Sequence, residues 1–186
     1  MSAYNAKDMA RSFRTVRANT ITIAEEIPEE HYGFRPAEGC RTVAETLAHI
    51  AVSPRFPQRL HGDRIKQTDF NLFSSAMQQQ MAGEAALTTR AQILEALRTG
   101  GEEFATFLDG LSDETLAERV HFPAGIEPPS KTRFEMLLST KEHEMHHRAQ
   151  LMVIERQLGI VPHLTRQMQA RMAAFQQQQQ QKGAAG

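Results

Sequence analysis

The sequence is poor in cysteine, carries almost no net charge and has no long apolar run. Its one cysteine, Cys40, excludes an internal disulfide framework and fits a reducing compartment. A formal net charge of −1 gives no electrostatic case for a nucleic-acid partner. No stretch approaches the roughly 18 apolar residues that a membrane span needs. Because no basic segment followed by an apolar run opens the chain, we expect a cytoplasmic protein with no membrane partner.

The composition is that of a soluble globular protein. Hydrophobic residues make up 40% of the 186 residues and charged residues 23%. A chain of this length is sufficient to bury a substantial core in one domain. We place this domain at residues 1–162 and expect residues 163–186 to be a helical extension with a glutamine-rich, low-complexity tail.

Four long segments repeat apolar residues at spacings of three and four, the period of an amphipathic α-helix. They cover residues 9–27, 42–60, 89–108 and 130–158. Thr42, Thr89 and Thr132 each precede a Glu or Gln by three residues, which is a capping-box pattern, and Ser130 is an alternative cap for the fourth helix. No segment has the pattern of a strand, so the expected fold class is all-α.

The connections between these segments are long. Residues 29–41, 62–87 and 110–129 each exceed the length of a simple helical hairpin, and residues 70–81 could add a short helix. Pro54 and Pro57 are expected to kink or interrupt the second helix. The pattern predicts a four-helix bundle with long crossover connections, in which the second and fourth helices adjoin.

The most informative motif is His143-Glu144-Met145-His146-His147 in the fourth helix. Residues four apart lie above one another on a helix, so His143 and His147 can direct two imidazole nitrogens at one ion. His146 points to another side. A third ligand completes a catalytic-type metal site, and His49 in the second helix is the natural candidate because its apolar neighbours anchor that helix in the core.

The remaining histidines lie apart from this site, and the surroundings of the motif do not fit a peptidase. His31, His61, His121 and His163 lie in or near connectors and element ends, where we expect surface positions. The motif also fits the H-E-x-x-H pattern of zinc peptidases. No Asp or Glu follows Glu155 as a third ligand, and no strand is expected that could bind an extended peptide. We therefore reject a peptidase.

With these residues in view, the sequence resembles the DinB-like family of metal-binding four-helix bundles. The resemblance lies in residues 32–37 (YGFRPA), 42–50 (TVAETLAHI), 143–151 (HEMHHRAQL) and 158–160 (LGI). It implies that His49, His143 and His147 bind a divalent metal, zinc or nickel in the first instance. The glycine that usually follows the family's His-Arg pair is Ala149 here, which leaves the implied ligands intact.

The resemblance also implies a range of functions. We expect a metal-dependent enzyme acting on a small molecule, either a transferase using a low-molecular-weight thiol as co-substrate or a hydrolase. The alternative is a non-catalytic, stress-related bundle whose metal is structural. For either function, the chain is expected to be able to form a homodimer. Three roles are open for Glu144: it supports the metal ligands, it carries a proton, or it is a charge on the helix face. Arg148 could bind a carboxylate, but a surface salt bridge is the favoured interpretation.

Overall fold

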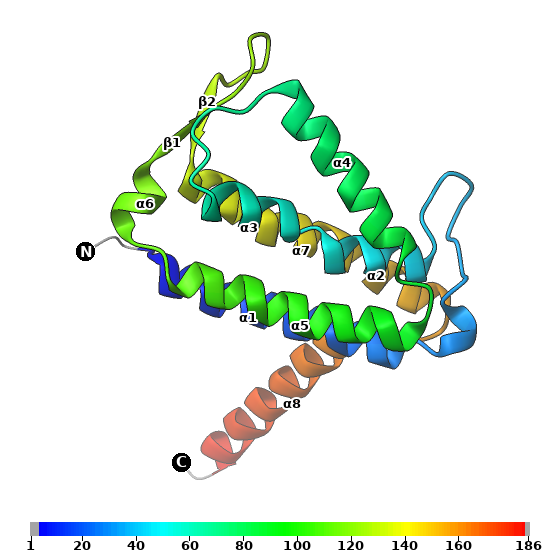
Figure 1. Cartoon of the computed structure of the whole chain (residues 1–186). Helices are drawn as coiled ribbons and strands as arrows, with labels where there is room; N and C mark the ends of the chain where they lie inside the picture. The colour runs from blue at the N-terminus through cyan, green and yellow to red at the C-terminus, as the bar shows by residue number, and fades with distance from the viewer. Residues whose placement is uncertain (1–3, 185–186) are drawn as a thin grey trace.

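A computed structural model describes the backbone of residues 4–184 and the side chains of residues 4–181. The chain is mainly helical, and only one small pair of strands interrupts the helices within the described residues (Figure 1). In chain order the elements are α1 (Ala6–Glu26), η1 (Glu29–His31), α2 (Val43–Val52), α3 (Arg55–Gly62), α4 (Phe70–Ala85), α5 (Arg90–Asp109), α6 (Asp113–Ala117), β1 (Arg119–His121), β2 (Ser130–Thr132), α7 (Arg133–Gln157) and α8 (His163–Ala184).

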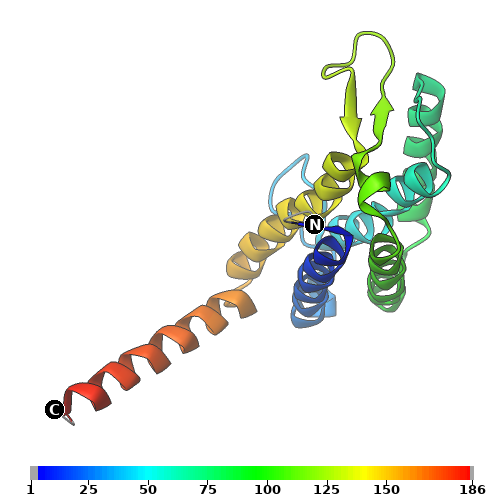
Figure 2. The ribbon, with the colours of Figure 1, turned by 90° about the vertical axis from the view of Figure 1, so that its left-hand side faces the viewer.

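Helices α1, α2, α5 and α7 form the bundle. Both α1 and α2 pack against α5 and against α7, so α1 and α2 lie diagonally opposite each other (Figures 1 and 2). A diagonal placement of consecutive helices requires a crossover, which is why residues 27–42 form a long connection. The predicted bundle with long crossovers is confirmed, and so is the contact between the second and fourth helices.

Two apolar clusters fill the bundle, and both are built from the stripes that the helical periodicity predicts. One occupies the end of the bundle where α2 begins and includes Ile23, Leu47, Ile93, Leu97 and Leu151. The other occupies the end near α6 and includes Phe13, Phe104, Leu108, Leu116 and Leu137. Burial of such side chains contributes roughly 1.5–3 kcal/mol each. The clusters therefore fix which faces of the four helices meet.

The predicted helix starts are confirmed in atomic detail. Thr42, Thr89 and Thr132 each close a capping box. At the start of α7 the Glu135 carboxylate accepts the Thr132 backbone N–H at 2.7 Å, and the Glu135 N–H donates to the Thr132 hydroxyl at 3.2 Å. Thr132 rather than Ser130 is the cap, because the Thr132 hydroxyl is the side-chain group that accepts the Glu135 N–H.

The prolines interrupt the second helical segment as expected. Helix α2 ends at Val52, and α3 begins at Arg55, immediately after Pro54. Pro57 lies in the first turn of α3, where its missing N–H removes no intrahelical hydrogen bond. The helix expected at residues 70–81 is present as the longer α4, of which Ala76 is the buried residue.

The expectation that no strand forms is wrong in one connector. Strands β1 and β2 pair antiparallel, with Arg119 opposite Thr132 and His121 opposite Ser130. Each strand has three residues, too few for an alternation of apolar and polar side chains to be recognised in the sequence. The pair leads the chain directly into α7.

The C-terminal helix α8 leaves the bundle, as Figure 2 shows most clearly. The glutamine-rich segment is therefore helical as far as the structure describes it, and residues 185–186 of the predicted tail lie outside the described residues. Among the helices of residues 4–184, none is both long and apolar enough to span a bilayer.

Candidate metal centre

Three histidines from two helices converge at the junction of α2 and α7. The Nε2 atom of His143 lies 3.1 Å from Nε2 of His49 and 3.1 Å from Nε2 of His147. One ligand atom from each of the three residues lies within 4.8 Å of the others. The structure therefore brings together the three residues that the sequence predicts as a set, with His49 almost one hundred positions before its partners.

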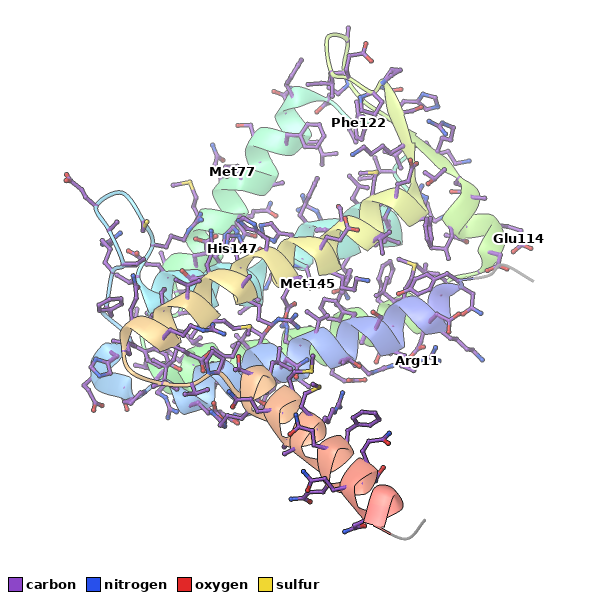
Figure 3. The ribbon with its side chains drawn as sticks, turned by 180° about the vertical axis from the view of Figure 1, so that it is seen from behind. Arg11, Met77, Glu114, Phe122, Met145 and His147 are labelled. Atoms are coloured by element: carbon purple, nitrogen blue, oxygen red, sulfur yellow. The ribbon has the colours of Figure 1, made fainter. Side chains whose placement is uncertain are left out.

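The local sequence explains how each imidazole is placed. His143 and His147 stand one turn apart on α7, so they share a face. His49 is partly buried in α2, between Leu47, which is fully buried, and Ile50, which is almost so. Figure 3 shows His147 on α7 with the ends of α2 and α4 behind it. Packing of α2 against α7 then sets the distance between the two helices' histidines.

Hydrogen bonds at the opposite ring nitrogens orient two of the imidazoles. Nδ1 of His49 lies 2.7 Å from the Glu84 carboxylate, which can only accept, so Nδ1 carries the proton and donates. Gln80 donates to the same carboxylate oxygen at 2.7 Å. Nδ1 of His147 donates in the same way to the Gln150 amide oxygen at 2.8 Å. Both Nε2 atoms consequently present lone pairs, and both face His143.

This arrangement fits a cation. Nε2 of His143 can donate a proton to only one of the two lone pairs, so in a neutral set at least one nitrogen lone pair faces the cluster without a proton. Burial, together with the neighbouring His147 and His49, lowers the pKa of His143 to about 4. Burial also lowers the pKa of His147, against a raising effect of Gln150. Lowered pKa values favour the neutral form of His143 and His147 at pH 7, which is the form that binds metals.

Orienting groups such as Glu84, Gln80 and Gln150 are common around metal-bound histidines, because they fix the tautomer and the ring orientation. Sequence reasoning missed all three. Gln150 had a local signal, since it lies three residues after His147 on the same helix. Glu84 and Gln80 had none, because they lie in a connector whose path over α2 depends on the complete fold.

Glu144 has a role that none of the three sequence interpretations anticipated. Its side chain is 3% exposed and pairs with the equally buried Arg17, with Nε and Nη2 of the guanidinium 2.9 Å from the carboxylate oxygens. Thr20 donates to the same carboxylate at 2.8 Å. Glu144 thus faces α1, away from the histidines, and does not act as the general base of an H-E-x-x-H peptidase.

Three expectations about other polar residues need correction. His61 and His163 are buried, not on the surface: Arg133 on α7 donates to His61 at 3.0 Å, and His163 lies 3.1 Å from the Asn19 amide oxygen. Arg148 is half-buried rather than on the surface, and this burial lowers its pKa. His146 is exposed, as predicted.

Two cavities flank the three histidines. One, of about 880 Å³, is lined by His147 and Gln150 together with Arg35, Arg41 and Cys40 from the segment before α2. The other, of about 540 Å³, includes His49 and His143 in its wall and is mostly apolar. Glu45 and Glu84 also line the first cavity, so small molecules can approach the histidines from a polar, mixed-charge side and from an apolar side.

This fold and this cluster define a helix bundle with a three-histidine candidate metal centre. The model of the DinB superfamily matches residues 12–151, and the chain belongs to that family. It is 25% identical over 147 residues, 79% of this chain and 86% of the relative, to the uncharacterised protein YjoA of Bacillus subtilis.

Two solved structures from Bacillus subtilis share the fold. The DinB-like protein YjoA has a TM-score of 0.61 at 24% identity, over 81% of this chain and 91% of YjoA. YfiT has a TM-score of 0.65 at 17% identity, over 86% of this chain and 91% of YfiT. YfiT is described as a probable metal-dependent hydrolase with an unusual four-helix bundle topology.

Proposed function

We propose that His49, His143 and His147 bind a divalent metal ion, zinc or nickel, and that the protein is a metal-dependent enzyme acting on a small molecule. The observation that carries the proposal is the convergence of three Nε2 atoms, two of which are held as lone-pair donors by Glu84 and Gln150. Three protein ligands, in some sites three histidines, are the usual complement of a catalytic zinc site, which keeps a position for water or substrate.

Hydrolysis is the first reaction to test. A divalent ion held by three neutral imidazoles supplies a Lewis acid that lowers the pKa of water or of a thiol. The description of YfiT as a probable metal-dependent hydrolase supports this reaction class for a protein of the same fold. The residues of this chain would position the ion and, through Glu84 and Gln150, hold the two imidazoles in the required tautomer.

Thiol transfer is the second candidate, and the polar cavity beside His147 favours it. Arg35 and Arg41 line this cavity together with Glu45 and Glu84, and Arg35 pairs with Glu45 at 3.1 Å. A low-molecular-weight thiol with a carboxylate would therefore bind Arg41 there, with its sulfur directed toward the histidines. Cys40 lines the same cavity and is exposed, so its substitution by serine tests whether the chain supplies a thiol of its own.

Metal binding is tested by stability. Because the three histidines meet only in the folded bundle, zinc at 100 times its dissociation constant should stabilise the protein by about 2.7 kcal/mol. Thermal melting of the purified protein with and without a chelator should show this difference. Alanine at His49, His143 or His147 should abolish it, whereas His146→Ala, the exposed control on α7, should retain it. Equal loss in the His146 variant would contradict the proposed ligand set.

Catalysis is tested separately on the metal-loaded protein. A panel of small esters and amides, and a second panel of electrophiles with a cellular thiol, should identify a reaction that stops on chelation. His49→Ala should lose the same reaction, and His146→Ala should keep it. If the loaded protein binds metal tightly but binds no thiol or carboxylate and converts no compound, the non-catalytic interpretation, in which the metal stabilises the bundle, is favoured instead.

A further inference from the structure

The apolar cavity beside the histidines has a composition unlike the rest of the site. It lies between α3, α4 and α7 and measures about 540 Å³, within the range of roughly 300–1,000 Å³ that small-molecule sites occupy. Three aromatic rings line it, from Phe56, Phe73 and Phe122. The Phe73 ring centroid lies 6.1 Å from that of Phe56 and 6.5 Å from that of Phe122, so the three rings form a continuous aromatic wall.

These rings are only partly buried, and further apolar surface at the cavity is open to solvent. Met77 on α4 lines the cavity, yet 62% of it is exposed. Figure 3 shows Met77 and Phe122 in the region where α4 and the β1–β2 pair approach each other. Helix α4 itself buries only Ala76 among its 16 residues. Exposed apolar surface beside a polar cluster is a feature of ligand-binding sites.

The charge of the lining is equally informative. Among the described residues that line the cavity, only Lys131 carries a full charge. His61 is neutral at pH 7, because burial and the adjacent Arg133 lower its pKa to about 4. Arg133 donates to Nδ1 of His61, so the proton resides on Nε2, which is buried and has no partner. Thr140 Oγ1 is also buried without a partner. The end of the cavity that His61 and Thr140 line therefore suits a neutral group of a ligand.

We infer that this cavity receives an aryl or similarly sized apolar group of the substrate, whose reacting end then lies at His49 and His143. The inference rests on the proposed function for the identity of the reacting end, and it adds the substrate class. The polar cavity on the other side of the histidines does not compete for such a group, because guanidinium and carboxylate groups surround it. The two cavities thus separate the recognition of an apolar group from that of a polar one.

A pair of metal-binding probes measures the contribution of the cavity. Acetohydroxamate and benzohydroxamate bind zinc through the same group and differ by a methyl against a phenyl. Transfer of the larger apolar surface into the cavity should make benzohydroxamate bind the zinc-loaded full-length protein on the order of 30-fold tighter. Isothermal calorimetry gives both dissociation constants. Equal affinities of the two hydroxamates would overturn the inference and leave the metal site intact.

Matched variants locate the effect. Ser139 on α7 lines the cavity, and Ser139→Phe should fill part of it and reduce the benzohydroxamate preference at least tenfold, while acetohydroxamate affinity stays unchanged. Ser74→Phe adds the same ring at an exposed position of α4 that does not line the cavity, so it should keep the preference. A preference that survives in the Ser139 variant would place the phenyl group elsewhere.

A second readout needs no metal. With the methionine methyl groups labelled with ¹³C, benzyl alcohol should shift the NMR signals of Met77 and Met136, which line the cavity, in the presence and absence of zinc. The signal of Met172, exposed on α8, should not move. Shifts at Met77 and Met136 without hydroxamate binding would sustain the apolar site and overturn the metal-dependent function. Unchanged signals at both residues would overturn the apolar site.

Discussion

Removal of the guanidinium of Arg17 should be among the most destabilising single changes in the bundle. Arg17 from α1 donates to Glu144 on α7, to the Leu97 carbonyl on α5 at 2.8 Å and to the Ile50 carbonyl on α2 at 3.2 Å. One side chain therefore connects all four helices of the bundle. It does so between the two apolar clusters, next to the positions that carry His49 and His143.

The magnitude follows from burial. The Arg17 and Glu144 side chains are 4% and 3% exposed, so solvent does not screen the pair. Arg17→Met keeps much of the apolar stem and removes the charge, which leaves the Glu144 carboxylate buried with Thr20 as its remaining donor. Breaking a buried pair in this way costs about 3–5 kcal/mol. That loss is a large part of the 5–15 kcal/mol by which domains are typically stable.

The assay is urea denaturation followed by far-ultraviolet circular dichroism, which suits a helical protein without tryptophan. Arg14→Met is the matched control, one turn earlier on α1. Its partners Glu102 and Asp109 are on the surface, so the same substitution should cost less than about 1 kcal/mol. Met at Arg17 combined with Leu at Glu144 replaces both charges and should recover most of the loss.

Two results would refute this reasoning. If Arg17→Met and Arg14→Met destabilise the protein equally, burial does not set the cost of losing the pair. If the double variant is as unstable as Arg17→Met alone, the loss comes from the carbonyl contacts to Leu97 and Ile50 or from packing, and not from an uncompensated carboxylate.

Three further predictions use buried groups and close contacts. Burial, with a smaller effect of Glu26, raises the pKa of Glu155 to about 7. The folded protein therefore favours the neutral carboxyl, whose stabilising contribution is complete below the unfolded pKa and is lost as the pH rises through 7 and the buried group ionises. Glu155→Gln should therefore raise the melting temperature at pH 8 and have little effect at pH 5, as thermal melts at both pH values would show. Glu84→Gln should weaken zinc binding about 10- to 100-fold in a chelator competition, because His49 loses the charged acceptor that orients it. Gly101→Ala should destabilise the protein by about 1–3 kcal/mol in urea despite alanine's higher helix propensity, since the new Cβ would lie 2.7 Å from Arg17 Cγ.

Much of the fold and part of the site follow from local patterns. The capping boxes at Thr42, Thr89 and Thr132 depend on residues three positions apart, and the helices begin where these patterns predict. The shared face of His143 and His147 follows from the helical period alone. These features are recognisable because every interaction that defines them lies within one turn of chain.

The strands and the buried histidines were not predictable in the same way. Pairing of β1 with β2 depends on a register between two three-residue segments, which leaves no periodic signal. His61 has the polar appearance of a surface residue, and it is buried because Arg133, 72 positions later, lies against it. A side chain near a connector can be enclosed by any element that the complete fold places over it.

The same distinction runs through the candidate centre. His143 and His147 were paired by sequence spacing, whereas the hydrogen bond of His49 to Glu84 and the ion pair of Arg17 with Glu144 join residues 35 and 127 positions apart. Which face of α4 covers α2, and which face of α7 meets α1, is decided by the packing of the whole bundle. Helical periodicity is set by backbone geometry and can be recognised in the sequence of any single helix. Contacts between helices depend on the free energy of burying all their faces together, and only the tertiary structure contains that information.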